Sequence, residues 1–169
     1  MTKSKLGLSE VVSTVLIIGV TVAVGAVVWA VVSNLVGEQI DEGEKCFGVI
    51  DQVQLNRDFT CYNSTSNMMQ FSLAVGDIDI NGVLVSVSYG GTSKSATLTN
   101  LSQNLADVTN YPSGTSGVKI PAKNSGATYF FEDVNSLPIS ISIIPIIGEQ
   151  QCGATDTQRE IIDCQALVS

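Results

Sequence analysis

The sequence predicts an α+β protein in which one long N-terminal hydrophobic helix precedes a small antiparallel β-sandwich or barrel. The first observation is a run without charged residues from Val11 to Val36. The second is a period-two pattern of apolar residues in Val83–Tyr89 and Ile139–Ile143, which is typical of strands. A length of 169 residues suffices for one domain and one further element. From the two patterns we expect a helix over residues 8–44 and a β domain over residues 45–169.

The composition argues against several functional classes. The chain has a formal net charge of −8 and contains no histidine. Ser-His-Asp and Cys-His catalysis and imidazole metal ligation are therefore excluded, and an acidic surface is unsuited to nucleic acid. We expect no enzymatic activity, no cofactor, no bound metal and no nucleic-acid partner.

The apolar run is long enough to span a membrane. At a rise of about 1.5 Å per residue it makes a helix of about 39 Å, which exceeds the roughly 30 Å hydrocarbon core of a bilayer. Lys3 and Lys5 precede it, so the positive-inside rule predicts a cytoplasmic N-terminus and an external β domain. The run is too long for a secretory signal and no A-x-A-like cleavage site follows it, so we expect it to remain in the mature protein.

The stretch "KLGLSEVVST", residues 5–14, resembles the N-terminus of archaeal type IV pilin precursors, which carry a short basic leader, a small residue and an apolar helix. The resemblance implies that residues 1–7 are a leader and that a prepilin peptidase cuts between Gly7 and Leu8. Glycine suits such a cut because it lets the peptidase approach the backbone closely. The resemblance also implies a membrane-inserted precursor that assembles with copies of itself into a surface filament.

Glu10 places a carboxylate at the start of the apolar run, where a charge without a partner is costly. The predicted cut would create an α-amino group at Leu8, and this cation is a candidate partner within one chain or between neighbours. Bacterial type IV pilins have the acid at the fifth mature position, whereas here it would be the third. The alternative is that Ser9 caps the helix and Glu10 interacts with the helix dipole.

Small residues recur along the predicted helix at spacings that permit close packing. Gly19 and Ala23 are four residues apart, as are Ala26 and Ala30, and Gly25 exposes the backbone at a further point. We therefore consider these five residues together with Glu10 as candidate assembly residues. The alternative is a lone membrane anchor, because glycine is also frequent in such helices.

Several further segments of the β domain have the composition of strands. Pro145 interrupts one of them and should lie at a bulge or an edge, because proline donates no hydrogen bond to a ladder. The Ser-, Thr- and Asn-rich segment Ser102–Gly117 is predicted to be a long exposed loop. The additional predicted strands are Phe47–Leu55, Met69–Val75, Ser95–Thr99, Ala127–Glu132 and Arg159–Cys164.

The four cysteines, Cys46, Cys61, Cys152 and Cys164, form no C-x-x-C motif, so zinc and redox-dithiol sites are poorly supported. Disulfides suit an external domain. Of the three possible connectivities we favour Cys46–Cys61 with Cys152–Cys164, because each closes a short segment near one end of the β domain. Four buried free thiols are the alternative.

The stretch "GDIDING", Gly76–Gly82, matches the beginning of a calcium-binding loop. Ser88 stands where such a loop supplies its bidentate glutamate, and Asn81-Gly82 is a strong hairpin-turn signal. We therefore predict a β-turn there, with Asp77 and Asp79 on one face of an exposed strand, and no metal.

Two N-x-S/T sequons begin at Asn63 and Asn100, both in polar surroundings on the predicted external side. Glycans at these positions would suit an extracellular surface.

Together these features predict a structural subunit of an archaeal type IV pilus-like surface filament that assembles through its N-terminal helix and serves in adhesion. Adhesion is implied by the resemblance and not by a particular residue. A second interpretation is a non-polymerising β-domain binding module, or minor pilin, tethered to the membrane by one helix. A third is an archaellin, which shares the leader and the helix-plus-β plan.

Overall fold

The computed structural model describes residues 6–112 and 117–164, with side chains described for residues 11–37, 46–112 and 117–164. The chain divides into two compact units, Met1–Gly43 and Glu44–Ser169, and each is considered by itself. The α+β fold class is confirmed: one long apolar helix precedes two β-sheets.

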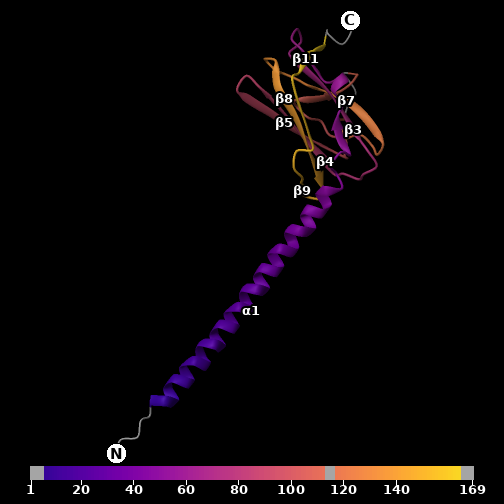
Figure 1. Cartoon of the computed structure of the whole chain (residues 1–169). Helices are drawn as coiled ribbons and strands as arrows, with labels where there is room; N and C mark the ends of the chain where they lie inside the picture. The colour runs from indigo at the N-terminus through magenta and orange to yellow at the C-terminus, as the bar shows by residue number, and fades with distance from the viewer. Residues whose placement is uncertain (1–5, 113–116, 165–169) are drawn as a thin grey trace, which may run out of the picture. The chain divides into compact units, whose positions relative to one another are not determined.

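The first unit consists of the helix α1, which begins at Leu6 and whose last turn, ending at Phe47, belongs to the second unit. Figure 1 shows α1 as one uninterrupted helix. Val, Thr and Gly have modest helix propensity in water, so this length of helix depends on an apolar environment. The predicted helix over residues 8–44 is therefore present and extends slightly farther at both ends.

In the described residues, the strands of the second unit form a six-stranded and a five-stranded sheet (Figure 1). The first sheet has the order β11-β2-β3-β7-β6 with β1 paired to β3, and contains β1 (Val53–Leu55), β2 (Cys61–Asn63), β3 (Met68–Val75), β6 (Val108–Asn110), β7 (Ser125–Phe131) and β11 (Ile162–Asp163). The second has the order β10-β8-β4-β5 with β9 paired to β8, and contains β4 (Gly82–Tyr89), β5 (Thr92–Thr99), β8 (Pro138–Ile147), β9 (Gln150–Gln151) and β10 (Asp156–Arg159).

The core lies between the inner faces of the two sheets. Alternate residues of each strand point inward, which is the period-two pattern of a half-buried sheet. Phe71 anchors the core, because its ring lies 5.3 Å from that of Tyr129 and 5.5 Å from that of Phe131. The other buried inward residues of the long strands are Met69, Leu73, Val75, Val83, Val85, Val87, Leu98, Ile141 and Ile143.

Side chains also join the two sheets at their edges. Asp156 on β10 accepts a hydrogen bond from the backbone N–H of Leu55 on β1 at 3.0 Å. Lys94 on β5 donates to Asp107 at 3.0 Å and to the carbonyl of Glu132, just after β7, at 3.1 Å. These links connect strands that do not share a ladder.

Most of the predicted long strands are confirmed. Met69–Val75, Val83–Tyr89, Ser95–Thr99, Ala127–Glu132 and Ile139–Ile143 correspond to β3, β4, β5, β7 and β8.

Two predicted strands are wrong over part of their length, because short turns interrupt them. In Phe47–Leu55, α1 continues through Phe47 and a turn follows, so only Val53–Leu55 is a strand. Arg159–Cys164 divides at Glu160, which adopts a φ of 61° and separates β10 from β11. The predicted loop Ser102–Gly117 contains the short strand β6.

The hairpin predicted at Asn81-Gly82 is wrong. Strands β3 and β4 belong to different sheets, so the segment Gly76–Asn81 crosses between sheets instead of turning within one. The hairpin lies at the other end of β4, where Gly90 and Gly91 have φ values of 53° and 80°. A two-residue turn with two positive φ angles matches the strand twist and favours glycine.

Pro145 lies at an irregularity of the sheet, as predicted. On one side it pairs with Val83 near the end of β8; on the other side the register shifts between the pairs Ile143–Asp156 and Ile146–Gln151. The carbonyl of Pro145 accepts from the N–H of Cys152, between β9 and β10. The nitrogen and carbonyl of one strand residue point the same way, so the missing N–H of proline faces a gap between two strands.

All four cysteines form disulfides, as predicted, but the predicted pairing is wrong. The bonds join Cys46 to Cys152 and Cys61 to Cys164, at sequence separations of 106 and 103. The second follows from the sheet, because β11 pairs in parallel with β2 and sets Ile162 opposite Cys61. Each bond therefore joins the beginning of the β domain to its end, instead of closing a short local loop.

Candidate functional sites

The span Val11–Gly37 of α1 is an exposed apolar surface. It contains 27 residues, its most apolar stretch of 18 residues has a mean hydropathy of 2.7, and it is the one helix in the described part of the chain long and apolar enough to cross a membrane. Every side chain in the span is exposed, including Trp29 at 74%. Exposed apolar area of this extent is unfavourable in water, so the span requires lipid or other helices around it.

The threonine hydroxyls of this span are satisfied within the helix. Thr14 donates to the carbonyl of Val11, and Thr21 donates to the carbonyl of Ile18, both at 2.9 Å. Bonding to the preceding turn lets a hydroxyl enter an apolar medium without losing its hydrogen bond. These two polar residues are therefore compatible with an apolar environment.

The glycines of the span have no packing role within the subunit. A Cβ added at Gly19 or Gly25 would meet no atom within 4 Å. Glycine costs about 1 kcal/mol relative to alanine in a helix interior, and no contact in the described residues offsets this cost. Ala23, Ala26 and Ala30 are likewise exposed. A benefit from these small residues requires a neighbouring helix or lipid.

The predicted processing and pairing residues are placed only in part. Gly7, Leu8 and Glu10 have helical backbone within α1, but their side chains lie outside the described part of the structure. The predicted pair between the Leu8 amino group and Glu10 therefore stays a prediction.

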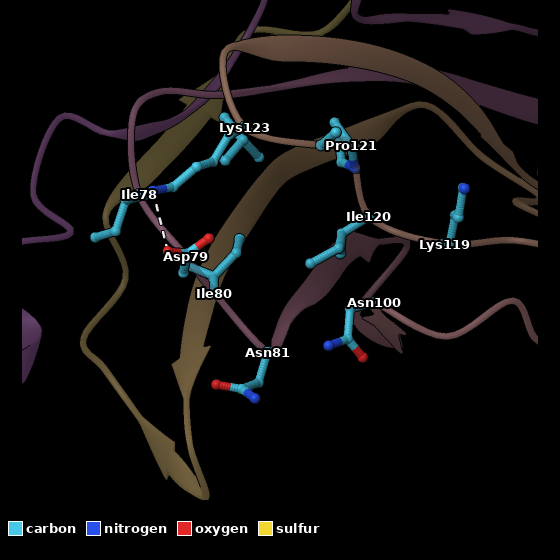
Figure 2. Close-up of a pocket in the computed structure, with 11 residues that line it drawn as sticks. Ile78, Asp79, Ile80, Asn81, Asn100, Lys119, Ile120, Pro121 and Lys123 are labelled. Atoms are coloured by element: carbon cyan, nitrogen blue, oxygen red, sulfur yellow. Dashed lines mark ion pairs between the residues drawn. The ribbon is translucent and has the colours of Figure 1, made fainter.

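The calcium-like stretch contributes to a hollow of about 390 Å³, which we call the loop hollow. It lies between the crossing segment Ile78–Asn81 and the segment Lys119–Lys123, with Asn100 beside Asn81 at the end away from Lys123 (Figure 2). Neither the volume nor its lining by two distant segments was apparent from the sequence.

Lys123 interacts with both carboxylates of the calcium-like stretch. Its Nζ lies 3.0 Å from Oδ2 of Asp79 and 3.6 Å from Oδ1 of Asp77. The hydrogen bond with Asp79 raises the pKa of Lys123 above its ordinary value. Among the side chains described, those of residues 11–37, 46–112 and 117–164, no group of three or more Cys, Asp or Glu residues is suited to a metal ion.

A second hollow, of about 300 Å³, lies on the outer face of the six-stranded sheet, and we call it the outer-face hollow. Because Met69, Phe71, Tyr129 and Phe131 point into the core, the residues between them point outward. The residues that line the hollow are Asn63, Ser66, Met68, Gln70, Phe130 and Cys164. The run "TYFF", residues 128–131, contains a signal that Phe130 points outward, because Tyr129 and Phe131 on either side of it are buried and side chains alternate along a strand.

Each sequon asparagine borders one hollow. Asn63 is half-buried and lines the outer-face hollow, whereas Asn100 is exposed and lines the loop hollow. The sequence predicted both as polar surface positions but gave no sign of the hollows beside them.

Comparison with known proteins finds no match to the chain among family models, curated proteins or solved structures. The architecture, a long apolar N-terminal helix followed by a β-rich domain, is consistent with that of type IV pilins. The apolar helix together with two disulfides points to a membrane-anchored or secreted extracellular protein.

Proposed function

We propose that this protein is a structural subunit of an archaeal type IV pilus-like surface filament that assembles through α1 and serves in adhesion. The observation that carries the proposal is the exposed apolar span Val11–Gly37 joined to a disulfide-bonded β domain. In this account the precursor is inserted in the membrane before assembly, with its N-terminus in the cytoplasm and its β domain outside the cell.

Assembly exchanges lipid contacts for helix contacts. Lipid tails and helix side chains are similarly apolar, so close van der Waals packing decides whether helices associate. The exposed glycines at positions 19 and 25 supply such packing when a sister helix approaches. The hydroxyls of Thr14 and Thr21 are bonded within the helix, so these two polar groups do not oppose this contact.

Processing prepares the helix for assembly in this account. A prepilin peptidase removes residues 1–7, and the new amino group at Leu8 pairs with the carboxylate of Glu10. Breaking one half of a buried ion pair costs about 3 to 5 kcal/mol, so Glu10→Gln should lower filament yield while processing continues. Normal filament yield in this variant would favour the alternative, in which Ser9 caps the helix and Glu10 interacts with the helix dipole.

A tethered binding module is the second candidate function. The loop hollow favours it, because about 390 Å³ lined by Asn81, Asn100 and Ile120 is sufficient for a small ligand. In that case α1 would serve as an anchor only. An archaellin, the subunit of a motility filament, has the same plan of helix and β domain. A swimming assay of cells that lack the protein would distinguish an archaellin from a pilin.

Electron microscopy of material sheared from the cell surface, combined with the intact mass of the subunit, tests the proposal. We expect filaments whose subunit begins at Leu8, with masses consistent with two disulfides. A Gly7→Phe variant should accumulate the full-length precursor and form no filaments, whereas Ser4→Ala, within the predicted leader but away from the cut, should behave as wild type. Full-length protein confined to the membrane fraction of wild-type cells would favour the tethered module instead.

A further inference from the structure

We propose that Asn63 carries an N-linked saccharide whose first sugar ring occupies the outer-face hollow and stabilises the β domain. The proposal goes beyond filament assembly and rests on it in one respect only, the external placement of the β domain. It assigns a glycan to the sequon at Asn63 and a binding position for its first sugar in the outer-face hollow.

The Asn63 side chain is held in a fixed orientation. Its Oδ1 accepts hydrogen bonds from the backbone N–H of Thr65 at 2.9 Å and from that of Ser66 at 3.2 Å. Because both turn residues bind the oxygen, the amide nitrogen Nδ2 points away from the turn. Within the described residues, Nδ2 donates no hydrogen bond, and it is the atom to which a sugar is attached.

The hollow beside Asn63 has the chemistry of a saccharide seat. Phe130 and Met68 supply an apolar floor, and Gln70 and Ser66 supply polar groups at the rim. The C–H groups on one face of a pyranose ring pack against such a floor while its hydroxyls bond to the rim. A volume of about 300 Å³ lies at the lower end for small-molecule sites.

The floor of the hollow is held in place by its own contacts. The Phe130 ring lies 5.7 Å from the ring of Tyr111, which is 62% exposed. Gln70 Nε2 donates to the carbonyl of Phe59 at 3.2 Å. Met68 lies directly opposite Asn63 in the β2–β3 ladder, so the attachment point and the floor of the hollow are neighbours on the same face of the sheet. The site is therefore in place before the sugar is attached.

The attachment step balances with a lipid-linked sugar phosphate as donor. The bond between Nδ2 and the sugar C1 forms, the bond between C1 and the phosphate oxygen breaks, and the phosphate leaves with the electron pair. Nδ2 loses one proton, which the leaving phosphate takes up. The sequon Asn63-Ser64-Thr65 requires the Thr65 hydroxyl for this modification.

The test is a double-mutant cycle with purified protein that contains both the helix and the β domain, produced in cells capable of N-glycosylation. Thr65→Ala removes the glycan but keeps the turn, since Thr65 contributes its backbone N–H to Asn63. Phe130→Thr removes the floor but keeps the sequon. Glycopeptide mass spectrometry establishes occupancy at Asn63, and thermal unfolding gives Tm for both single variants and the double variant.

We expect Thr65→Ala to lower Tm by about 2 to 4 °C and to have no effect on Tm in the Phe130→Thr background. Phe130→Leu, which keeps an apolar side chain but lacks the aromatic ring, replaces Phe130→Thr if the latter does not fold. Ser102→Ala, which removes the sequon at Asn100, is the matched control, and its effect on Tm should be the same with or without Phe130.

Absence of a glycan on Asn63 in the wild type would overturn the proposal. Equal effects of Thr65→Ala in both backgrounds would also overturn it, because the sugar would then lie outside the hollow. Neither result depends on whether filaments form, so failure of this inference is distinguishable from failure of the proposed function.

Discussion

Tyr129 is the residue at which burial has the clearest consequence for pH dependence. It is completely buried, and its hydroxyl donates to the carbonyl of Lys119 at 2.6 Å. Burial raises the pKa of Tyr129 well above the ordinary value of 10.0. The folded state therefore keeps the phenol proton at a pH where the unfolded chain loses it, so this stability is complete below pH about 10 and declines as pH rises above it.

We predict that Tyr129→Phe reduces the alkaline loss of stability. At pH 8 the variant should lose about 1 kcal/mol through the missing hydrogen bond to Lys119. Between pH about 10 and 11 its free energy of unfolding should fall less steeply with pH than that of the wild type. Urea unfolding across this range provides the measurement, and parallel curves for the two proteins would contradict the explanation.

Gln158 and Gln103 provide a pair of predictions of opposite sign. Gln158 is 7% exposed, and its Oε1 is buried without a hydrogen-bond partner. Gln103 Nε2, by contrast, donates to the carbonyl of Thr97 at 2.6 Å on the edge strand β5. Gln158→Met should raise the free energy of unfolding by about 1 kcal/mol, and Gln103→Met should lower it by a similar amount. Chemical denaturation measures both, and destabilisation by Gln158→Met would show that its amide is needed.

Individual residues were predictable where a local pattern determines their environment. Val83, Val85 and Val87 are buried as their alternation indicates. The partners of Lys123 and Lys94 were not predictable, because each lysine binds carboxylates on a different segment of the chain. Such pairs arise from sheet topology, which a single sequence does not reveal.

At the scale of elements, long strands were predicted well and short strands were not. The eight residues of β4 repeat the period-two pattern several times, whereas β2, with three residues, is too short to show a period. Asn81-Gly82 has the composition of a hairpin turn, but β3 and β4 lie in different sheets. Turn composition specifies a local bend and does not specify the sheet to which the next strand belongs.

The disulfides are the elements whose pairing most strongly tests the β domain. Each closes a loop of more than 100 residues, for which chain entropy gives about 4.7 kcal/mol. Replacing Cys46 and Cys152 together by alanine should lower stability by about 2 to 5 kcal/mol, and the same change at Cys61 and Cys164 should have a similar effect.

Non-reducing peptide mapping checks the connectivity directly. We expect one peptide that joins Cys46 to Cys152 and one that joins Cys61 to Cys164. A peptide joining Cys46 to Cys61 would contradict the sheet arrangement, because the parallel pairing of β2 with β11 brings Cys61 to Cys164.

The helix α1 allows a prediction that separates subunit packing from helix stability. Gly19→Leu removes a helix-destabilising residue, and the Cβ that it adds would meet no atom within 4 Å. If Gly19 packs against a sister helix, the larger side chain should keep the subunit folded but strongly reduce filament yield. Val22→Leu is the control, because Val22 is 67% exposed and already large. Filament yield is measured by microscopy of sheared material. An unchanged yield in Gly19→Leu cells would show that Gly19 does not pack against a sister helix.

For the whole molecule, the sequence was sufficient to predict the order of helix and strands but not the contacts between distant segments. The charge-free run Val11–Val36 and the alternating strands predicted a helix followed by a small β-sandwich or barrel, and the structure contains one long helix followed by two β-sheets. The disulfide pairing and the two hollows depend on contacts between distant segments. They could not be predicted because cysteine spacing permits several pairings and the sequence does not reveal the strand order.

The central claim is that copies of this protein polymerise through α1, and a three-dimensional reconstruction of the filaments by electron cryomicroscopy tests it most directly. The account predicts a central bundle of helices formed by Val11–Gly37, surrounded by β domains. The density should begin at Leu8 in each subunit. A filament in which β domains make the subunit contacts while the apolar spans lie outside the core would contradict the account.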